Sequence, residues 1–174
     1  MSSGVKKTNA MRMLDSAKIP YEVRTYEFEE TDLAGIHAAD AVGMPYETVF
    51  KTLVARGDKT GFVVFCIPVA EELDLKKAAR ASKNKSVELL HVKDLLPTTG
   101  YIRGGCSPVG MKKEFPTYID ETAMLFDAIA VSGGMRGVQL IVNPDQLLGF
   151  VKGEYVDLTA QHRANCNGDK NLLI

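Results

Sequence analysis

Residues 50–68 read FKTLVARGDKTGFVVFCIP, and the architecture of the chain can be inferred by working outward from them. Two strand-like runs, Phe50–Ala55 and Gly61–Pro68, flank a polar loop at 56–60 that contains a glycine, which is typical of a β-hairpin. The second run is apolar on both faces, as expected for a central strand. This stretch therefore predicts a hairpin whose second strand lies inside a sheet, with Cys66 as a small packed side chain.

Shorter elements are predicted on both sides of this hairpin. Helices are expected where a capping residue precedes apolar residues spaced three or four apart, and strands where short apolar runs lie between turn residues. The predicted helices cover residues 9–17, 36–42 and 75–81 (with Leu75, Ala78 and Ala79 facing inward), a short segment ending near Pro97, and a segment starting at Pro144 behind the cap Asn143. The predicted strands cover residues 21–28, 87–90, 117–120, 128–132 and 138–142. Strands and short helices mix without regular alternation, which favours an α+β domain with a mixed, largely antiparallel sheet.

Length and composition suit one ordinary domain. The chain has 174 residues, of which 45% are hydrophobic and 25% charged, and domains usually hold about 100–200 residues. No run approaches the roughly 18 apolar residues of a membrane span, and the opening MSSGVKKTNA lacks the apolar core of a secretory signal. We expect a single cytoplasmic domain over 1–174, with a loosely held tail from about 160 and no membrane partner.

Neither a metal nor a cofactor is expected. The three cysteines lack C-x-x-C spacing, and the isolated histidines form no metal-binding motif. These residues are Cys66, Cys106, Cys166, His37, His91 and His162. His162 and Cys166 lie four apart, but two ligands in a polar tail make a weak metal site. The chain also lacks a phosphate-binding loop and a serine nucleophile elbow.

The net charge of −1 provides no global field that would attract nucleic acid. We therefore expect no DNA partner, and any RNA contact must come from a local patch. The densest basic run holds Lys76, Lys77, Arg80, Lys83 and Lys85. Charge alone favours a solvated helix face for this run, with RNA contact as the alternative.

Lys51 and two glycine-rich segments are the candidates for chemistry. Lys51 interrupts an apolar strand, where a buried ammonium is costly unless it meets an anion or oxygen acceptors; the alternative is a strand-edge lysine whose end reaches water. The segments GYIRGGCSPVG at 100–110 and VSGGMRG at 131–137 either present backbone N–H groups to a ligand or form irregular turns. Cys106 is disfavoured as a nucleophile because no histidine is placed to ionise its thiol.

Taken together, these segments resemble the YbaK family. The matching motifs are Thr25-Tyr26-Glu27, Lys51-Thr52-Leu53, Pro68-Val69-Ala70, Leu73-Asp74-Leu75-Lys76-Lys77, the stretch from Thr99 to Gly110, and Ser132-Gly133-Gly134 with Arg136-Gly137. The resemblance covers about residues 9–158, with the motifs in order. It implies a free-standing aminoacyl-tRNA editing domain whose mixed, largely antiparallel sheet is curled into a partial barrel with flanking helices.

The activity that this resemblance implies is deacylation of mischarged tRNA, above all Cys-tRNA(Pro). Prolyl-tRNA synthetase mischarges its tRNA with cysteine because two side chains of similar size are separated by only a few kcal/mol. That synthetase is therefore a candidate partner beside aminoacyl-tRNA itself. The family's proposed mechanism uses the substrate's own thiol, which attacks the ester and leaves as a thiolactone.

The resemblance also implies roles for individual residues. Lys51 would hold the terminal adenosine or the ester, and the N–H groups of Gly104 and Gly105 would face the carbonyl. The implied substrate-binding residues are Tyr26, Thr52, Ser107, Ser132 and Gly133, and the implied tRNA-binding residues are Lys76, Lys77 and Arg80. Three positions depart from the family pattern and affect substrate range: Leu33 replaces an aromatic residue, Gln139 replaces an acid found in some members, and Cys106 replaces an aliphatic residue.

Three alternatives stay open. A related enzyme would clear alanine from tRNA(Pro) with a positioned water, since alanine has no thiol. A non-catalytic tRNA- or synthetase-binding module would have kept the pocket without turnover, although Lys51 and both glycine segments argue against it. A cysteine hydrolase would use Cys106.

Overall fold

The computed structural model describes residues 5–160, so the predicted loose tail, with His162 and Cys166, lies outside the described residues. The helices are α1 (Asn9–Ser16), α2 (Gly35–Val42), η1 (Tyr46–Thr48), α3 (Leu75–Ser82), α4 (Val92–Thr99), η2 (Glu121–Leu125) and α5 (Pro144–Val151). The strands are β1 (Tyr21–Thr25), β2 (Phe50–Gly57), β3 (Gly61–Pro68), β4 (Val87–Leu89), β5 (Thr117–Asp120), β6 (Ile129–Ser132), β7 (Val138–Val142) and β8 (Glu154–Val156). Within residues 5–160, every helix is too short or too polar to cross a bilayer.

The predicted hairpin forms and is longer than expected. β2 and β3 pair from Phe50 opposite Pro68 to Gly57 opposite Gly61, so the ladder includes two residues that the sequence assigned to the loop. In the added part of the ladder, the Arg56 guanidinium lies 4.9 Å from the centre of the Phe62 ring on the opposite strand, which is a favourable cation–π contact. The connecting turn is therefore only residues 58–60.

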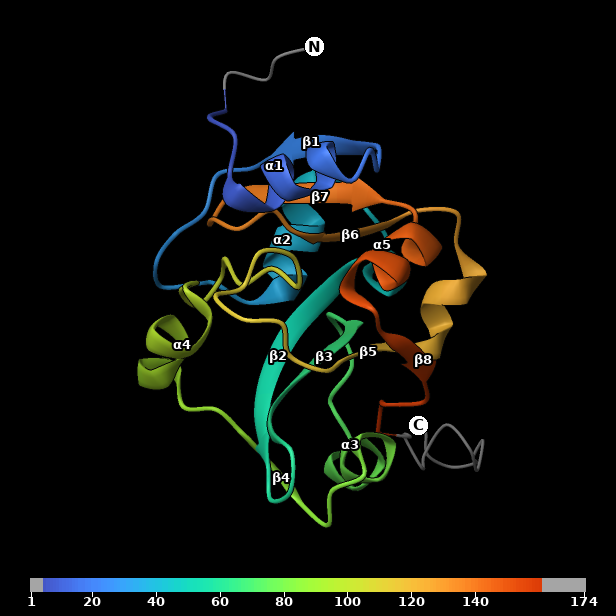
Figure 1. Ribbon diagram of the computed structural model, residues 1–174. Helices are drawn as coiled ribbons and strands as arrows, with labels where there is room; N and C mark the ends of the chain where they lie inside the picture. Colours follow the sequence, from blue (N-terminus) through green and yellow to red (C-terminus); the bar gives the residue numbers. More distant parts are fainter. Residues whose placement is uncertain (1–4, 161–174) are drawn as a thin grey trace, which may run out of the picture.

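The strands form two sheets, in the orders β1-β7-β6 and β4-β2-β3-β5-β8. Most pairings are antiparallel, but β5 runs parallel to both β3 and β8. A parallel bridge between Val49 and Ala130 joins the sheets at the start of β2. Figure 1 shows the β1-β7-β6 sheet lying across one end of the β2–β3 hairpin, with α3 at the other end. The α+β class with a curled, mixed sheet is confirmed, and the curl stops short of a closed barrel.

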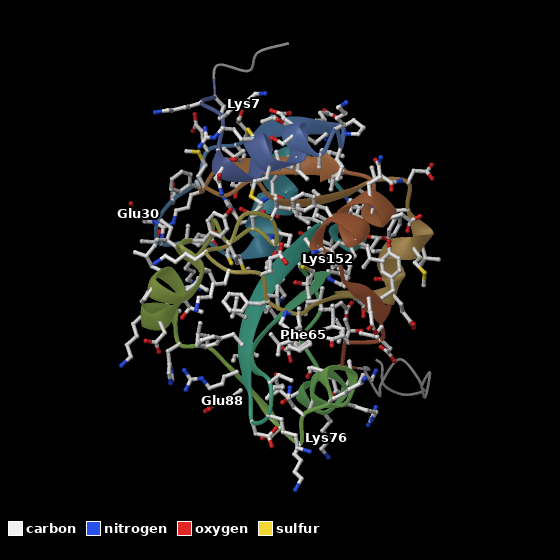
Figure 2. The ribbon with its side chains drawn as sticks, in the orientation of Figure 1. Lys7, Glu30, Phe65, Lys76, Glu88 and Lys152 are labelled. Atoms are coloured by element: carbon white, nitrogen blue, oxygen red, sulfur yellow. The ribbon has the colours of Figure 1, made fainter. Side chains whose placement is uncertain are left out.

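β3 is the central strand, as its sequence predicted. Val64 and Cys66 face a core shared with α1, β6 and β7, whereas Phe65 and Ile67 face a second core against α3. The Phe65 ring, labelled near the middle of Figure 2, stacks on Tyr118 with centroids 5.8 Å apart. Because both faces of the strand are covered, β3 is buried from Val63 to Pro68.

Two details of the predicted helices are wrong. Leu75 is 44% exposed, since the buried stripe of α3 instead extends to Ser82, whose hydroxyl donates to the Ala78 carbonyl. α4 does not end near Pro97 but continues to Thr99, and Gly100 terminates it with φ +88°. A proline is tolerated there because the residue lies on the exposed side of the helix, where water can satisfy the freed carbonyl.

Two strand boundaries also differ. β1 ends at Thr25 rather than at residue 28, because its partner β7 begins only at Val138, after the turn at Gly137 with φ +82°. β8 was not predicted: its three residues pair in parallel with β5, which no local pattern indicates.

Candidate active site

A cavity of about 400 Å³ lies between the two sheets and the helices α2 and α4. β2 forms one wall, the ends of β6 and β7 contribute to another, and Arg103, Gly104 and Cys106 complete the lining from the loop after α4. The polar or glycine positions that line it are Tyr26, Gly35, Lys51, Thr52, Arg103, Gly104, Ser132 and Gln139. Within residues 5–160, the lining includes no histidine, aspartate or glutamate. Apart from Lys51, its side chains offer no obvious general base, so the walls can bind and polarise a substrate more readily than they can deprotonate one.

Lys51 lies on β2 opposite Ile67, half-buried and in the cavity wall. Burial lowers the pKa of its ammonium, and the attraction of Glu72 and Glu71 only partly offsets this effect. Lys51 is therefore a partly desolvated lysine at a cavity and not one that is fully exposed to bulk water. A half-desolvated cation of this kind interacts more strongly with an anionic or carbonyl oxygen than an exposed one does.

The two glycines of the 103–106 loop have different roles. Gly104 lines the cavity with φ +87°, and a Cβ there would come within 3.3 Å of two Leu33 atoms. Gly105 is not part of the lining, and its amide donates to the Ile102 carbonyl at 3.0 Å. The structure thus places Gly104, but not Gly105, where its amide could face a substrate carbonyl.

The absent Cβ of Gly105 instead allows the loop to pack against the turn after β6. A Cβ at this position would lie 3.0 Å from backbone atoms of Met135 and Arg136. The Arg136 side chain closes the same contact by donating from Nε to the Arg103 carbonyl at 2.8 Å. The two glycine-rich segments that the sequence singled out therefore lie side by side, and only Gly104 remains as a candidate amide donor.

The remaining predicted substrate-binding residues divide in the same way. Tyr26, Thr52 and Ser132 line the cavity. Ser107 does not, because it is fully buried and its Oγ accepts the Val109 amide at 3.2 Å. Gly133 also lies outside the lining: its amide donates to the Val138 carbonyl at 2.9 Å, which closes the β6–β7 turn. Both residues are bonded within the protein, and neither lies at the cavity.

Gln139, noted from the sequence only as a departure from the family pattern, also lines the cavity. It lies on β7 opposite Ser132 of β6, and only 6% of its surface is exposed. A lone amide in the apolar run VQLIV is the signal that could have identified it, since strand interiors seldom hold an unexplained polar side chain.

Cys106 also lines the cavity, but burial raises the pKa of its thiol to about 12, and a hydrogen bond with Thr99 opposes this only in part. A thiol with that pKa stays protonated near neutral pH and is a poor nucleophile. We expect Cys106→Ser to keep deacylation within a few-fold of wild type in single-turnover assays. The loss of an essential nucleophile costs several orders of magnitude, so a decrease of that size in a folded variant would establish the cysteine-hydrolase reading.

The three basic residues of α3 lie away from this cavity. Lys77 Nζ donates to Asp157 Oδ2 at 2.9 Å and to the Thr159 carbonyl at 2.8 Å, so its ammonium is bound within the protein. Lys76 and Arg80 are exposed, and none of the three lines the cavity. Figure 2 shows Lys76 extending from the end of the molecule opposite Lys7. Any tRNA contact on α3 would therefore involve a part of the tRNA remote from the ester.

The fold and the cavity agree with one class of protein. The chain belongs to the family of aminoacyl-tRNA editing domains, whose sequence profile, described as "Aminoacyl-tRNA editing domain", matches residues 32–150. This confirms the family recognised from the motifs. The class of activity is that of an aminoacyl-tRNA deacylase, which hydrolyses the ester between an amino acid and its tRNA.

One relative carries a more specific name. Over 156 residues the chain is 50% identical to the Enterococcus faecalis protein named "Putative Cys-tRNA(Pro)/Cys-tRNA(Cys) deacylase EbsC", and the match covers 90% of this chain and 95% of that protein.

Solved structures agree on the fold. A structure described as "Crystal structure of a putative trans-editing enzyme for prolyl tRNA synthetase" has a TM-score of 0.75 at 24% identity, and the protein described as "hypothetical protein APE2540" has 0.80 at 17%. These matches cover 90% and 88% of this chain and all of the other chain. At such identities the likeness supports the architecture alone.

Proposed function

We propose that this chain removes cysteine from mischarged tRNA, with Cys-tRNA(Pro) as its substrate, and that the substrate's thiol supplies the nucleophile. The observation that supports this best is the make-up of the cavity wall. It combines one half-desolvated lysine and a glycine loop with hydroxyl groups, and within residues 5–160 it has neither a histidine nor a carboxylate. A substrate that brings its own nucleophile needs only orientation and stabilisation of negative charge. The name of the Enterococcus faecalis relative supports the same choice of amino acid.

The proposed reaction balances without a protein nucleophile. The cysteine sulfur forms a bond to its own carbonyl carbon, the ester C–O bond to the ribose breaks, and the thiol proton ends on the ribose oxygen. The products are free tRNA and a strained thiolactone, which water opens to cysteine. The Lys51 ammonium and the Gly104 amide are the groups of the wall suited to stabilise the developing oxyanion, and preorganised donors of this kind are often the largest catalytic contribution.

The test is a deacylation panel with the purified full-length chain. We expect rapid release of cysteine from Cys-tRNA(Pro), slower release of alanine from Ala-tRNA(Pro) and none of proline from Pro-tRNA(Pro). Preferential hydrolysis of Ala-tRNA(Pro) would favour the related enzyme that positions a water. Tight tRNA binding without turnover would favour a binding module. Cys-tRNA(Cys) in the same panel shows whether the tRNA itself is recognised.

The substrate also implies a setting for this activity. Because tRNA is charged in the cytoplasm, we propose that deacylation takes place there. A single domain acting in trans would receive its substrate after release from prolyl-tRNA synthetase. That synthetase is the proposed protein partner, and pull-down of the purified synthetase by the chain, with and without tRNA(Pro), tests the partnership directly.

The tRNA-binding role of Lys76, Lys77 and Arg80 remains a proposal, which the exposed pair Lys76 and Arg80 can test. Each single-stranded phosphate contact contributes about −0.7 to the slope of log affinity against log salt. Replacing both residues by alanine should therefore weaken tRNA binding and reduce the slope by about 1.4, with an unchanged rate at saturating enzyme. Lys113→Ala, which removes an exposed cation elsewhere, is the matched control. An unchanged slope in the double variant would mean that α3 presents only a solvated face.

A further inference from the structure

The amide oxygen of Gln139 is the one buried side-chain polar atom within residues 5–160 that lacks a hydrogen-bond partner. The residue is the second of β7, more than nine-tenths buried, and lines the cavity. A buried acceptor without a partner destabilises the folded protein. Because Gln139 lines the cavity, a group of a bound ligand is a candidate partner for this oxygen.

The cross-strand neighbours of Gln139 on the same face of the sheet bond elsewhere. Arg24, opposite it on β1, donates from Nε to Glu22 at 3.0 Å and from Nη1 to the Val42 carbonyl at 3.5 Å. Ser132, opposite it on β6, accepts the Gly134 amide at 3.2 Å. Neither cross-strand neighbour donates a hydrogen bond to the Gln139 oxygen.

The charge of the cavity wall decides which substrate group suits this acceptor. The wall holds the cations Lys51 and Arg103, and its described residues include no carboxylate. The carbonyl of an aminoacyl ester and the phosphates of its tRNA can both interact with these cations. The α-amino group instead needs a hydrogen-bond acceptor. The Gln139 oxygen is such an acceptor, and among the buried side-chain polar atoms of residues 5–160 it is the one without a hydrogen-bond partner.

We propose that Gln139 recognises the free α-amino group of the aminoacyl ester by accepting a hydrogen bond from it. This inference rests on the proposed function and adds a selection rule. The cavity takes aminoacyl-tRNA with an unblocked amino group and rejects N-acylated aminoacyl-tRNA and peptidyl-tRNA. An N-acyl group removes one N–H, adds bulk at a closed wall and leaves the oxygen of Gln139 unpaired or clashing. Gln139 is thus a specificity residue that prevents this esterase from hydrolysing peptidyl-tRNA.

The test compares Cys-tRNA(Pro) with N-acetyl-Cys-tRNA(Pro) in single turnover for wild type, Gln139→Leu and Gln139→Glu. We expect wild type to prefer the free-amino substrate at least tenfold. Gln139→Leu removes the acceptor at similar volume and should lower the rate for the free-amino substrate about tenfold or more while leaving the N-acetyl rate unchanged. Gln139→Glu keeps an acceptor and should keep the preference. Gln146→Leu, an exposed glutamine on α5, is the matched control.

Two further measurements separate this proposal from its alternatives. Gln139→Leu should unfold at a temperature equal to or above that of wild type, because it removes an unpartnered buried atom, whereas a structural role would lower the unfolding temperature. Calorimetric binding of cysteinyl-3′-amino-3′-deoxyadenosine, whose amide resists hydrolysis, against its N-acetyl form tests recognition even if wild type shows no turnover. Equal binding of the two forms by wild type, or an equal loss of both in Gln139→Leu, would overturn the assignment of Gln139 whatever the fate of the proposed reaction.

Discussion

Lys51→Met should lower the single-turnover deacylation rate by about 10²–10³-fold, because loss of one preorganised oxyanion donor costs about 2.7–4 kcal/mol at the transition state. Methionine keeps the length of the apolar stem and removes only the charge. The control is Lys59→Met, which changes an exposed lysine in the turn of the same hairpin and should leave the rate unaltered. A folded Lys51→Met protein with near-normal turnover would disprove the proposed role.

Lys51→Met is also expected not to destabilise the folded protein, although it removes a charged side chain. Burial lowers the pKa of Lys51 below 10.5, so the charged form is less favourable in the folded than in the unfolded protein. Between the folded and unfolded pKa values, the unfolded chain binds more protons, and this residue's contribution makes stability rise with pH. Lys51→Met should therefore unfold at a temperature no lower than wild type near neutral pH, and the difference should shrink above pH 10. Thermal unfolding of both proteins at several pH values measures this.

Loss of the Lys51 charge should also limit the deacylation rate at alkaline pH. The ammonium of Lys51 is lost as the pH rises through its lowered pKa, so deacylation should decline below the pH at which an exposed lysine titrates. The rate of Lys51→Met should lack this decline, which separates the lysine from alkaline unfolding of the protein.

The second large effect concerns the substrate. Cys-tRNA(Pro) should be cleared at least 10³-fold faster than Ser-tRNA(Pro), because an intramolecular nucleophile in the right geometry is worth roughly 7–11 kcal/mol and the serine hydroxyl is a far weaker nucleophile than the thiol. The two side chains are nearly isosteric, so the cavity should admit both. The comparison is made at saturating enzyme in single turnover, with Ala-tRNA(Pro) as a third substrate on the same tRNA.

Two outcomes distinguish the mechanisms. A large preference for cysteine with similar binding of all three substrates supports attack by the thiol. Equal rates would instead indicate a water positioned by the cavity hydroxyls of Thr52 and Ser132, and the proposed mechanism would be wrong. Comparison of dissociation constants under the same conditions shows whether a rate difference arises in binding or in chemistry.

Much of the fold follows from local patterns along the chain. The caps Thr8, Asp74 and Asn143 each accept backbone amides at the start of the helix that follows them, as their residue types predicted. The run FVVFCIP is buried on both faces and lies at the centre of its sheet. These features depend on residues close together in sequence, or on hydrophobicity alone, and so they can be inferred without coordinates.

The sequence by itself determined the hairpin, the α+β class, the family and the five cavity residues Tyr26, Lys51, Thr52, Gly104 and Ser132. Only the tertiary structure showed that Gly105 and Gly133 are occupied by backbone bonds and that Lys77 is bound to Asp157, eighty residues away. It alone brought Gln139 to the wall with its oxygen unpaired. The physical reason is that a motif indicates which polar groups are present, whereas their remaining capacity to bind a ligand depends on partners that only folding brings together.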